Sequence, residues 1–297
     1  MNNHPADAAL WTLSLTVPEG AAALAGGAPS EPVAAGEGVT TTWVYDDPVS
    51  PYLLAFAAGA FEIVREAGPG GLPVTLALPP DLPPEPRATL GEIPAMLEYF
   101  EGLFGPYPGR RFGAAVVDGF GGALETEEMV IFGRPSVSPR TVAHEIAHHW
   151  FGNSVRIESW SDIWLNEAFG RYAEILWTEH AEGPIARDAA LGQLAGAVTR
   201  QAAAGAPPVA LPTIESLFGG NTYNRGALML HALRARLGDD AFFALLRDWN
   251  ARYANEAAGT DEFVALATSF AGEDLSEFFD DWLYRPEAPD PLLPPLG

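Results

Sequence analysis

Alternating polar and apolar positions mark the first part of the chain. Residues 13–17, Leu-Ser-Leu-Thr-Val, alternate with period two and stop at Pro18-Glu19-Gly20, which is typical of a strand with one buried face. Three further runs are rich in β-branched, aromatic or apolar residues, and glycine and proline separate them: residues 40–45, 53–63 and 74–78. The pattern predicts strands and loops for residues 1–85.

From residue 86 onward apolar residues recur at steps of three and four, the period of an amphipathic helix. The clearest case runs from Ile93 through Met96, Leu97 and Phe100 to Phe104. Two short strands are expected next, at residues 112–117 and 129–132. The remaining periodic segments predict helices over residues 138–152, 161–181, 184–203, 222–237, 239–253, 260–270 and 273–283.

A proline-rich stretch, residues 79–86, separates the two patterns and is the best candidate for a domain boundary. We therefore expect a β domain over residues 1–85 and a mostly helical domain over residues 86–297. The fold class that follows is α+β.

Composition excludes several chemistries. The 297 residues include no cysteine, which rules out disulfides, thiolate metal sites and cysteine nucleophiles. All 16 basic residues are arginine, so a Schiff-base lysine and a P-loop lysine are absent as well. With 48% hydrophobic residues the chain has ample material for a core.

The formal net charge of −23 makes nucleic acid and anionic membranes poor partners. The charge either serves solubility or attracts cationic ligands, and the sequence leaves both open. No segment has the apolar length of a membrane span or the pattern of a signal peptide. We expect a soluble and most simply cytoplasmic chain, with export of a longer precursor still open.

The segment His144-Glu145-Ile146-Ala147-His148 fits the pattern H-E-x-x-H on an expected helix. Residues four apart lie one turn apart on the same face, so the two imidazoles can reach one metal ion. Glu145 lies beside the first ligand, where a carboxylate can take a proton from water activated by the metal.

A third ligand is expected from the next helix. Glu167 follows His148 after eighteen residues, enough for the first helix to end near Gly152 and for the chain to turn back. Two histidines and one carboxylate leave an open position, the arrangement of catalytic zinc sites. The alternative is that Glu167 is a solvated helix residue. Asp162 is a weaker candidate for holding a ligand histidine in orientation, and His149 points away from His148.

These residues resemble the zinc aminopeptidase family of alanyl aminopeptidase and leukotriene hydrolase, the gluzincins. The zinc helix of the family is similar to residues 142–153 and its third-ligand helix to residues 160–167. Residues 51–56 and 278–283 resemble, respectively, a strand of its N-terminal β domain and the end of its catalytic domain. The resemblance implies one Zn²⁺ ion and a thermolysin-like, mostly helical catalytic domain that follows a partial β-sheet domain.

The resemblance also implies a substrate-binding strand. The family's Gly-Ala-Met-Glu-Asn segment, on an edge strand, matches Gly122-Ala123-Leu124-Glu125-Thr126 here. Glu125 would bind the free α-amino group of a peptide, with Gly122 and Ala123 beside the substrate. Leu124 and Thr126 depart from the pattern, and the alternative for Glu125 is a surface carboxylate.

A tyrosine completes the expected site. Tyr223-Asn224-Arg225-Gly226 is similar to the family's Tyr-x-Lys-Gly, and the Tyr223 hydroxyl would donate a hydrogen bond to the developing oxyanion. Its alternative is an aromatic residue packed in the core.

The expected function is removal of N-terminal residues from peptides with a free N-terminus. Because the chain is short for this family, an open cleft and endopeptidase activity on the same scaffold stay possible. A non-catalytic peptide-binding module is the alternative from a different class. The sequence leaves the oligomeric state, the preferred first residue and the physiological metal open.

Overall fold

The computed structural model describes residues 3–293 and residue 296. It divides into two compact units. The first takes in the described residues up to Gly102 together with Pro106–His149. The second takes in Leu103–Gly105 and the described residues from Trp150 onward.

The first unit holds three β-sheets. One sheet has the order β1-β5-β3, with β4 also paired to β5, and a second is the pair β2-β6. The third is a mixed five-stranded sheet with the order β10-β11-β9-β8-β7, in which β8, β9 and β11 run parallel. The strands are β1 (Thr12–Pro18), β2 (Ala22–Ala25), β3 (Ala28–Pro29), β4 (Val33–Ala35), β5 (Gly38–Val44), β6 (Phe56–Gly59), β7 (Glu62–Ala67), β8 (Pro73–Leu78), β9 (Phe112–Val117), β10 (Ala123–Leu124) and β11 (Val130–Gly133).

Alternation explains the pairing of β1 with β5. Residues along β1 alternate between more and less exposed, so one face of the strand is more exposed than the other. The polar side chains on the exposed face lie opposite polar side chains of β5. Ser14 Oγ lies 2.8 Å from Thr42 Oγ1, and Thr16 Oγ1 lies 2.7 Å from Thr40 Oγ1. Such cross-strand pairs set the register of a sheet.

Within the described part of the first unit the α-helices are α1 (Pro84–Leu90), α2 (Ile93–Phe104, whose last two residues belong to the second unit) and α3 (Pro139–His148). Ser138 caps α3, because its hydroxyl accepts a hydrogen bond from the Thr141 N–H at 3.2 Å. Every residue of α3 from Val142 to His148 is buried. Burial fixes the orientation of the two histidines on this helix.

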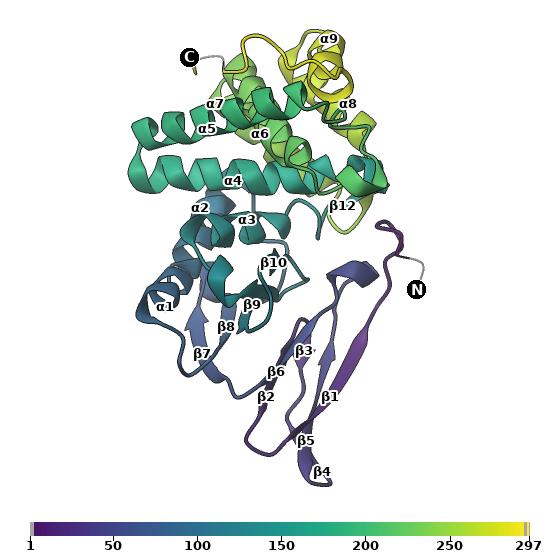
Figure 1. Cartoon of the computed structure of the whole chain (residues 1–297). Coiled ribbons are helices and arrows are strands. Elements are labelled where there is room, and N and C mark those ends of the chain that lie inside the picture. Colours follow the sequence, from purple (N-terminus) through teal and green to yellow (C-terminus); the bar gives the residue numbers. More distant parts are fainter. Residues whose placement is uncertain (1–2, 294–295, 297) are drawn as a thin grey trace. The chain divides into compact units, whose positions relative to one another are not determined.

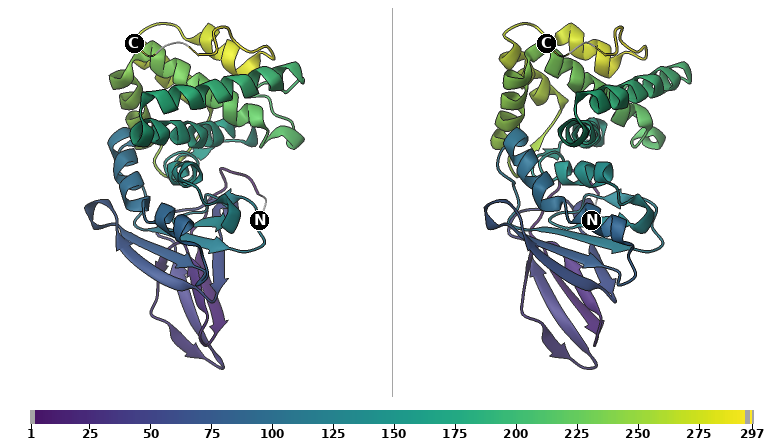
Figure 2. Two further views of the ribbon diagram at one scale, coloured as in Figure 1. Left: turned by 60° about the vertical axis from the view of Figure 1, so that its left-hand side comes forward. Right: turned by 90° about the vertical axis from the view of Figure 1, so that its left-hand side faces the viewer.

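The second unit is helical (Figure 1), and its helices stay grouped in the turned views of Figure 2. It contains α4 (Trp164–Glu182), α5 (Pro184–Ala203), α6 (Gly220–Leu237), α7 (Asp239–Arg252), α8 (Thr260–Ala271), α9 (Ser276–Phe279) and a π-helical turn, Asp280–Tyr284, besides the strand pair β12 (Arg156–Ile157) and β13 (Ala257–Ala258). Among the described residues, no helix combines the length and apolar character needed to cross a bilayer.

The mixed fold is confirmed, with strands early and helices later, while some expected elements are wrong. The run 53–63 is not one strand, because a 3₁₀ turn ends at Leu53. A tight turn, in which the Phe61 N–H donates a hydrogen bond to the Gly59 carbonyl, separates β6 from β7. Residues 79–86 are only partly a linker, because Pro84 begins α1, where a missing N–H does no harm. The expected helix 273–283 is divided into α9 and the π-helical turn.

The predicted boundary at residue 85 stays a prediction.

Candidate active site

The histidines of the H-E-x-x-H segment lie on one face of α3. Their ring centroids are 4.8 Å apart and the ring planes are inclined by 69°. His144 is 8% exposed, Glu145 5% and His148 1%. Buried imidazoles and carboxylates lose hydration, which must be replaced by polar partners or a metal ion.

Glu167 lies in the first turn of α4, where the local sequence places it firmly. A turn over Trp160–Asp162 precedes the helix, and Gly152 packs against Asn166, the residue before Glu167. Gly152 has φ = +123°, and a Cβ there would lie 2.9 Å from Asn166 Cγ. Only glycine adopts this φ without strain and leaves room for the Asn166 side chain, so the turn requires glycine at position 152.

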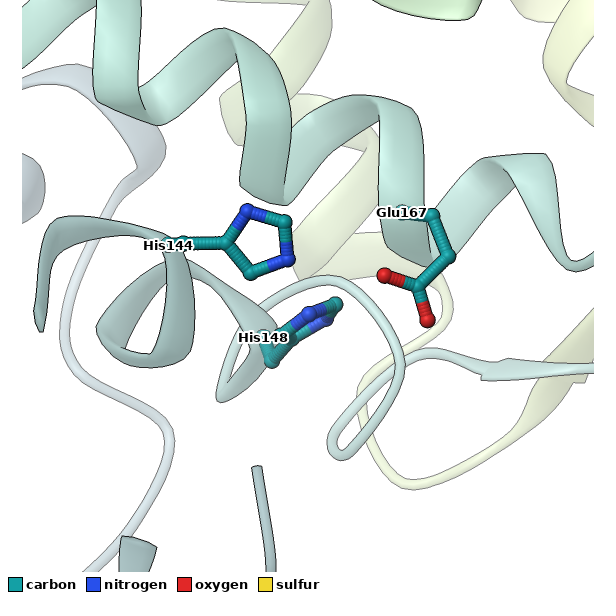
Figure 3. A group of neighbouring side chains, drawn as sticks. All are labelled: His144, His148 and Glu167. Carbon is teal, nitrogen blue, oxygen red and sulfur yellow. The ribbon is translucent and has the colours of Figure 1, made fainter. Parts of the chain in front are cut away.

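His144, His148 and Glu167 form a three-residue cluster (Figure 3). One ligand atom from each lies within 4.8 Å of the others, and the Glu167 carboxylate points toward the two rings. Glu167 is only 4% exposed, so its alternative as a solvated helix residue is wrong. Two imidazoles and one carboxylate are the donor set of catalytic zinc sites, and the residues present therefore fit one such ion.

Glu125, Glu145 and His148 form a second group of the same kind, with ligand atoms within 4.8 Å of one another. Both groups need His148, so they describe one centre rather than two independent metal sites. The second group shows that the carboxylates of Glu125 and Glu145 meet beside the same histidine. Glu125 follows β10, which is an edge of the five-stranded sheet, as the resemblance implied.

The backbone beside Glu125 is well fixed. The Gly122 carbonyl accepts hydrogen bonds from the Gly133 N–H at 2.8 Å and from Ser136 Oγ at 2.6 Å. Ala123 pairs with Phe132 across β10 and β11. Gly122 and Ala123 thus anchor the strand, and their contact with a substrate stays a prediction.

Glu128 is a residue near the site that the sequence did not single out. It is 7% exposed and adopts φ = +54°, an unusual conformation for a residue with a side chain. Its carboxylate accepts hydrogen bonds from the N–H groups of Gly27 and Arg110 and from the Arg111 guanidinium. These contacts hold the turn that follows Glu125, and no sequence pattern signals them.

Tyr223 lies in the first turn of α6 and is half-buried. Two residues later, Arg225 is 1% exposed and donates to the carbonyls of Asp281, Arg285, Pro286 and Glu287. The turn that carries Tyr223 is therefore fastened to the end of the helical unit. The role of Tyr223 as an oxyanion donor stays a prediction.

His149 and Asp162 belong to the structural framework. His149 Nδ1 lies 2.7 Å from the Tyr107 hydroxyl, and burial lowers the His149 pKa to about 3. Asp162 accepts hydrogen bonds from Ser159 and from Thr260, which begins α8. Because both of its carboxylate oxygens serve these partners, the expectation that Asp162 holds a ligand histidine is wrong.

The cluster offers the donor set of a catalytic zinc site, and the sequence comparison gives the family of the chain. Residues 111–282 match the peptidase family M1 domain. The chain therefore belongs to peptidase family M1.

Similar proteins include endoplasmic reticulum aminopeptidase 1 of Homo sapiens, 33% identical over 217 residues, which are 65% of this chain and 23% of that protein. Glutamyl aminopeptidase of Homo sapiens is 26% identical over 94% of this chain and 32% of that protein. The chain thus spans about a quarter to a third of the length of these relatives.

Solved structures resemble the chain over nearly its whole length. An M1 zinc metallopeptidase from Deinococcus radiodurans has a TM-score of 0.89 at 30% identity, covering 100% of this chain and 68% of that one. The E323A mutant of the M1 zinc metallopeptidase from that organism, bound to a Tyr-Ser-Ala substrate, gives a TM-score of 0.88 at 30% identity, covering 99% of this chain and 68% of that one.

Proposed function

We propose that the chain is a zinc-dependent aminopeptidase that binds one Zn²⁺ through His144, His148 and Glu167. The observation that carries the proposal is the meeting of two carboxylates, Glu125 and Glu145, beside a histidine of the ligand cluster. One carboxylate can bind a substrate amine while the other handles protons. The names of the similar proteins, aminopeptidases and zinc metallopeptidases, support the same class.

Glu125 binds the ammonium group of the peptide by charge pairing, and this sets which peptide bond is presented. A bound zinc ion supplies Lewis acidity, which polarises a carbonyl and acidifies water. Glu145 takes a proton from the attacking water and returns it to the leaving amine. The Tyr223 hydroxyl donates a hydrogen bond to the carbonyl oxygen as negative charge develops there.

Hydrolysis of free and N-acetylated aminoacyl amides, together with metal analysis, tests this proposal. We expect turnover of the free amides only, with one zinc per chain. Turnover of both would instead indicate an endopeptidase, and turnover of neither in the zinc-loaded chain would indicate a peptide-binding module.

Glu145→Gln tests the role of Glu145 in the chemical step. It keeps the size of the side chain and removes the base, so we expect retained zinc and a kcat lower by about 10²–10⁴-fold. Unchanged kcat would contradict the role of Glu145.

A further inference from the structure

Helices α4 and α6 approach closely at one point, where Gly226 faces Ala168. A Cβ at position 226 would lie 2.5 Å from the Cβ of Ala168, closer than two carbon atoms can pack. The missing side chain of Gly226 therefore sets how near the two helices lie.

This point of contact lies next to two proposed site residues. Ala168 directly follows Glu167 on α4. Gly226 follows Tyr223 by three residues on α6, and residues three apart are neighbours on a helix surface. Any widening at this contact moves the turn that carries the tyrosine away from the turn that carries the metal ligand.

Other contacts prevent the helices from sliding to relieve a clash. Arg225 fastens the first turns of α6 to four backbone carbonyls between Asp281 and Glu287. Farther along, Arg234 on α6 and Glu179 on α4 form an ion pair at 2.8 Å, with the Arg234 side chain only 6% exposed. A larger residue at 226 must therefore spread the helices at the end where Glu167 and Tyr223 lie.

We infer that Gly226 is a positioning residue, which through its contact with Ala168 sets the distance between the Tyr223 hydroxyl and the Glu167 carboxylate. The inference rests on the proposed function, since it concerns the geometry of that reaction. Misplacement of a catalytic group by about 1 Å can lower a rate by about 10²-fold.

A pair of substitutions tests the inference. Gly226→Ala introduces the clash, and we expect kcat to fall by about 30-fold or more while KM changes by less than about threefold. Ala168→Gly together with Gly226→Ala moves the methyl group from one helix to the other. The new Cβ at position 226 then lies 3.6 Å from the Cα of residue 168 and 4.0 Å from Val209 Cγ1, which are ordinary contacts. We expect this double variant to recover kcat to within about fivefold of the parent.

Gly192→Ala is the control for adding a methyl group to a helical glycine. Gly192 lies within α5, and a Cβ placed there meets no side chain and no neighbouring segment within 4 Å. We expect unchanged kinetics. If Gly226→Ala does not fold, Ala168→Ser introduces a smaller intrusion from the other helix, and a smaller fall in kcat with little change in KM is expected.

Tyr223→Phe distinguishes positioning from general damage to the fold. If Gly226→Ala acts by misplacing the tyrosine, then adding Gly226→Ala to Tyr223→Phe lowers kcat by less than about twofold further. Multiplication of the two effects, or Gly226→Ala kinetics within threefold of the parent, would overturn the inference. Absence of turnover in the parent chain, or normal turnover of Tyr223→Phe alone, would instead count against the proposed function.

Discussion

Individual carboxylates near α3 are expected to have separable roles, although Glu125 and Glu145 lie close together. Replacing Glu125 with Gln keeps the shape of the side chain and removes the charge that pairs with an ammonium group. We expect KM for free aminoacyl amides to rise about 10–100-fold, since hydrogen bonds to charged groups contribute roughly 1.5–3 kcal/mol. Steady-state kinetics check this, with Glu127→Gln as the neighbouring control. An unchanged KM in Glu125→Gln would contradict the amine-binding role.

Buried His231 is expected to make stability depend on pH. Burial, with smaller effects of the Arg234 and Arg187 charges, lowers its pKa from 6.5 to about 4. The unfolded chain therefore binds a proton near pH 6.5, whereas the folded chain binds it only near pH 4. Stability should fall as pH drops through this window, by about 3 kcal/mol from this residue.

Denaturant unfolding of the parent and of His231→Gln, at several pH values between 4 and 7, measures this effect. The difference between the two free energies of unfolding should change with pH, because only the parent has the histidine. A constant difference would show that His231 does not cause the pH dependence.

The site residues differ in how far the sequence could predict them. His144, His148 and Glu167 form a spacing that is readable without a structure, and the three do meet. The roles of Glu128 and Gly226 could not be found in this way, although Gly226 ends the motif that begins at Tyr223. Their importance lies in a buried hydrogen-bonded carboxylate and a close helix contact, which depend on segments far apart in the sequence.

Among the secondary-structure elements, the segment between α3 and α4 determines where α4 begins and therefore where Glu167, in its first turn, lies. Gly152→Ala should destabilise the chain by about 2 kcal/mol or more, because the new Cβ meets Asn166 and the backbone has φ = +123°. We also expect weaker zinc binding, since Asn166 precedes Glu167. Thermal unfolding and zinc titration measure the two effects.

Gly205→Ala is the matched control for Gly152→Ala. Gly205 also has a positive φ, +77°, but a Cβ placed there meets no neighbouring segment within 4 Å. We expect a loss of only about 1 kcal/mol and unchanged zinc affinity. Equal effects of the two substitutions would show that the contact with Asn166 is unimportant.

Sequence periodicity predicted the long elements better than the short ones. The helix expected at 184–203 and the strand at 112–117 have the observed bounds, because each has an uninterrupted pattern and a clear end. Strands β2, β3 and β4 were not predicted. They are two to four residues long, and they depend on pairing with β5 and β6 rather than on their own sequence.

At the scale of the whole molecule, the charge of −23 is expected to act on substrate capture. Long-range attraction accelerates the approach of cations and is screened by salt. We expect kcat/KM for arginine-containing peptides to fall several-fold between low salt and about 0.5 M salt, while neutral peptides of the same length change little. Equal salt dependence for both would leave solubility as the role of the charge.

The proposed function depends on His144, His148 and Glu167 binding one zinc ion. A crystal structure of the zinc-loaded chain, with anomalous diffraction measured at the zinc edge, tests it most directly. We expect one strong peak about 2.0–2.2 Å from a nitrogen of each histidine and an oxygen of Glu167. A peak elsewhere, or one bound by the histidines with Glu167 turned away, would contradict it.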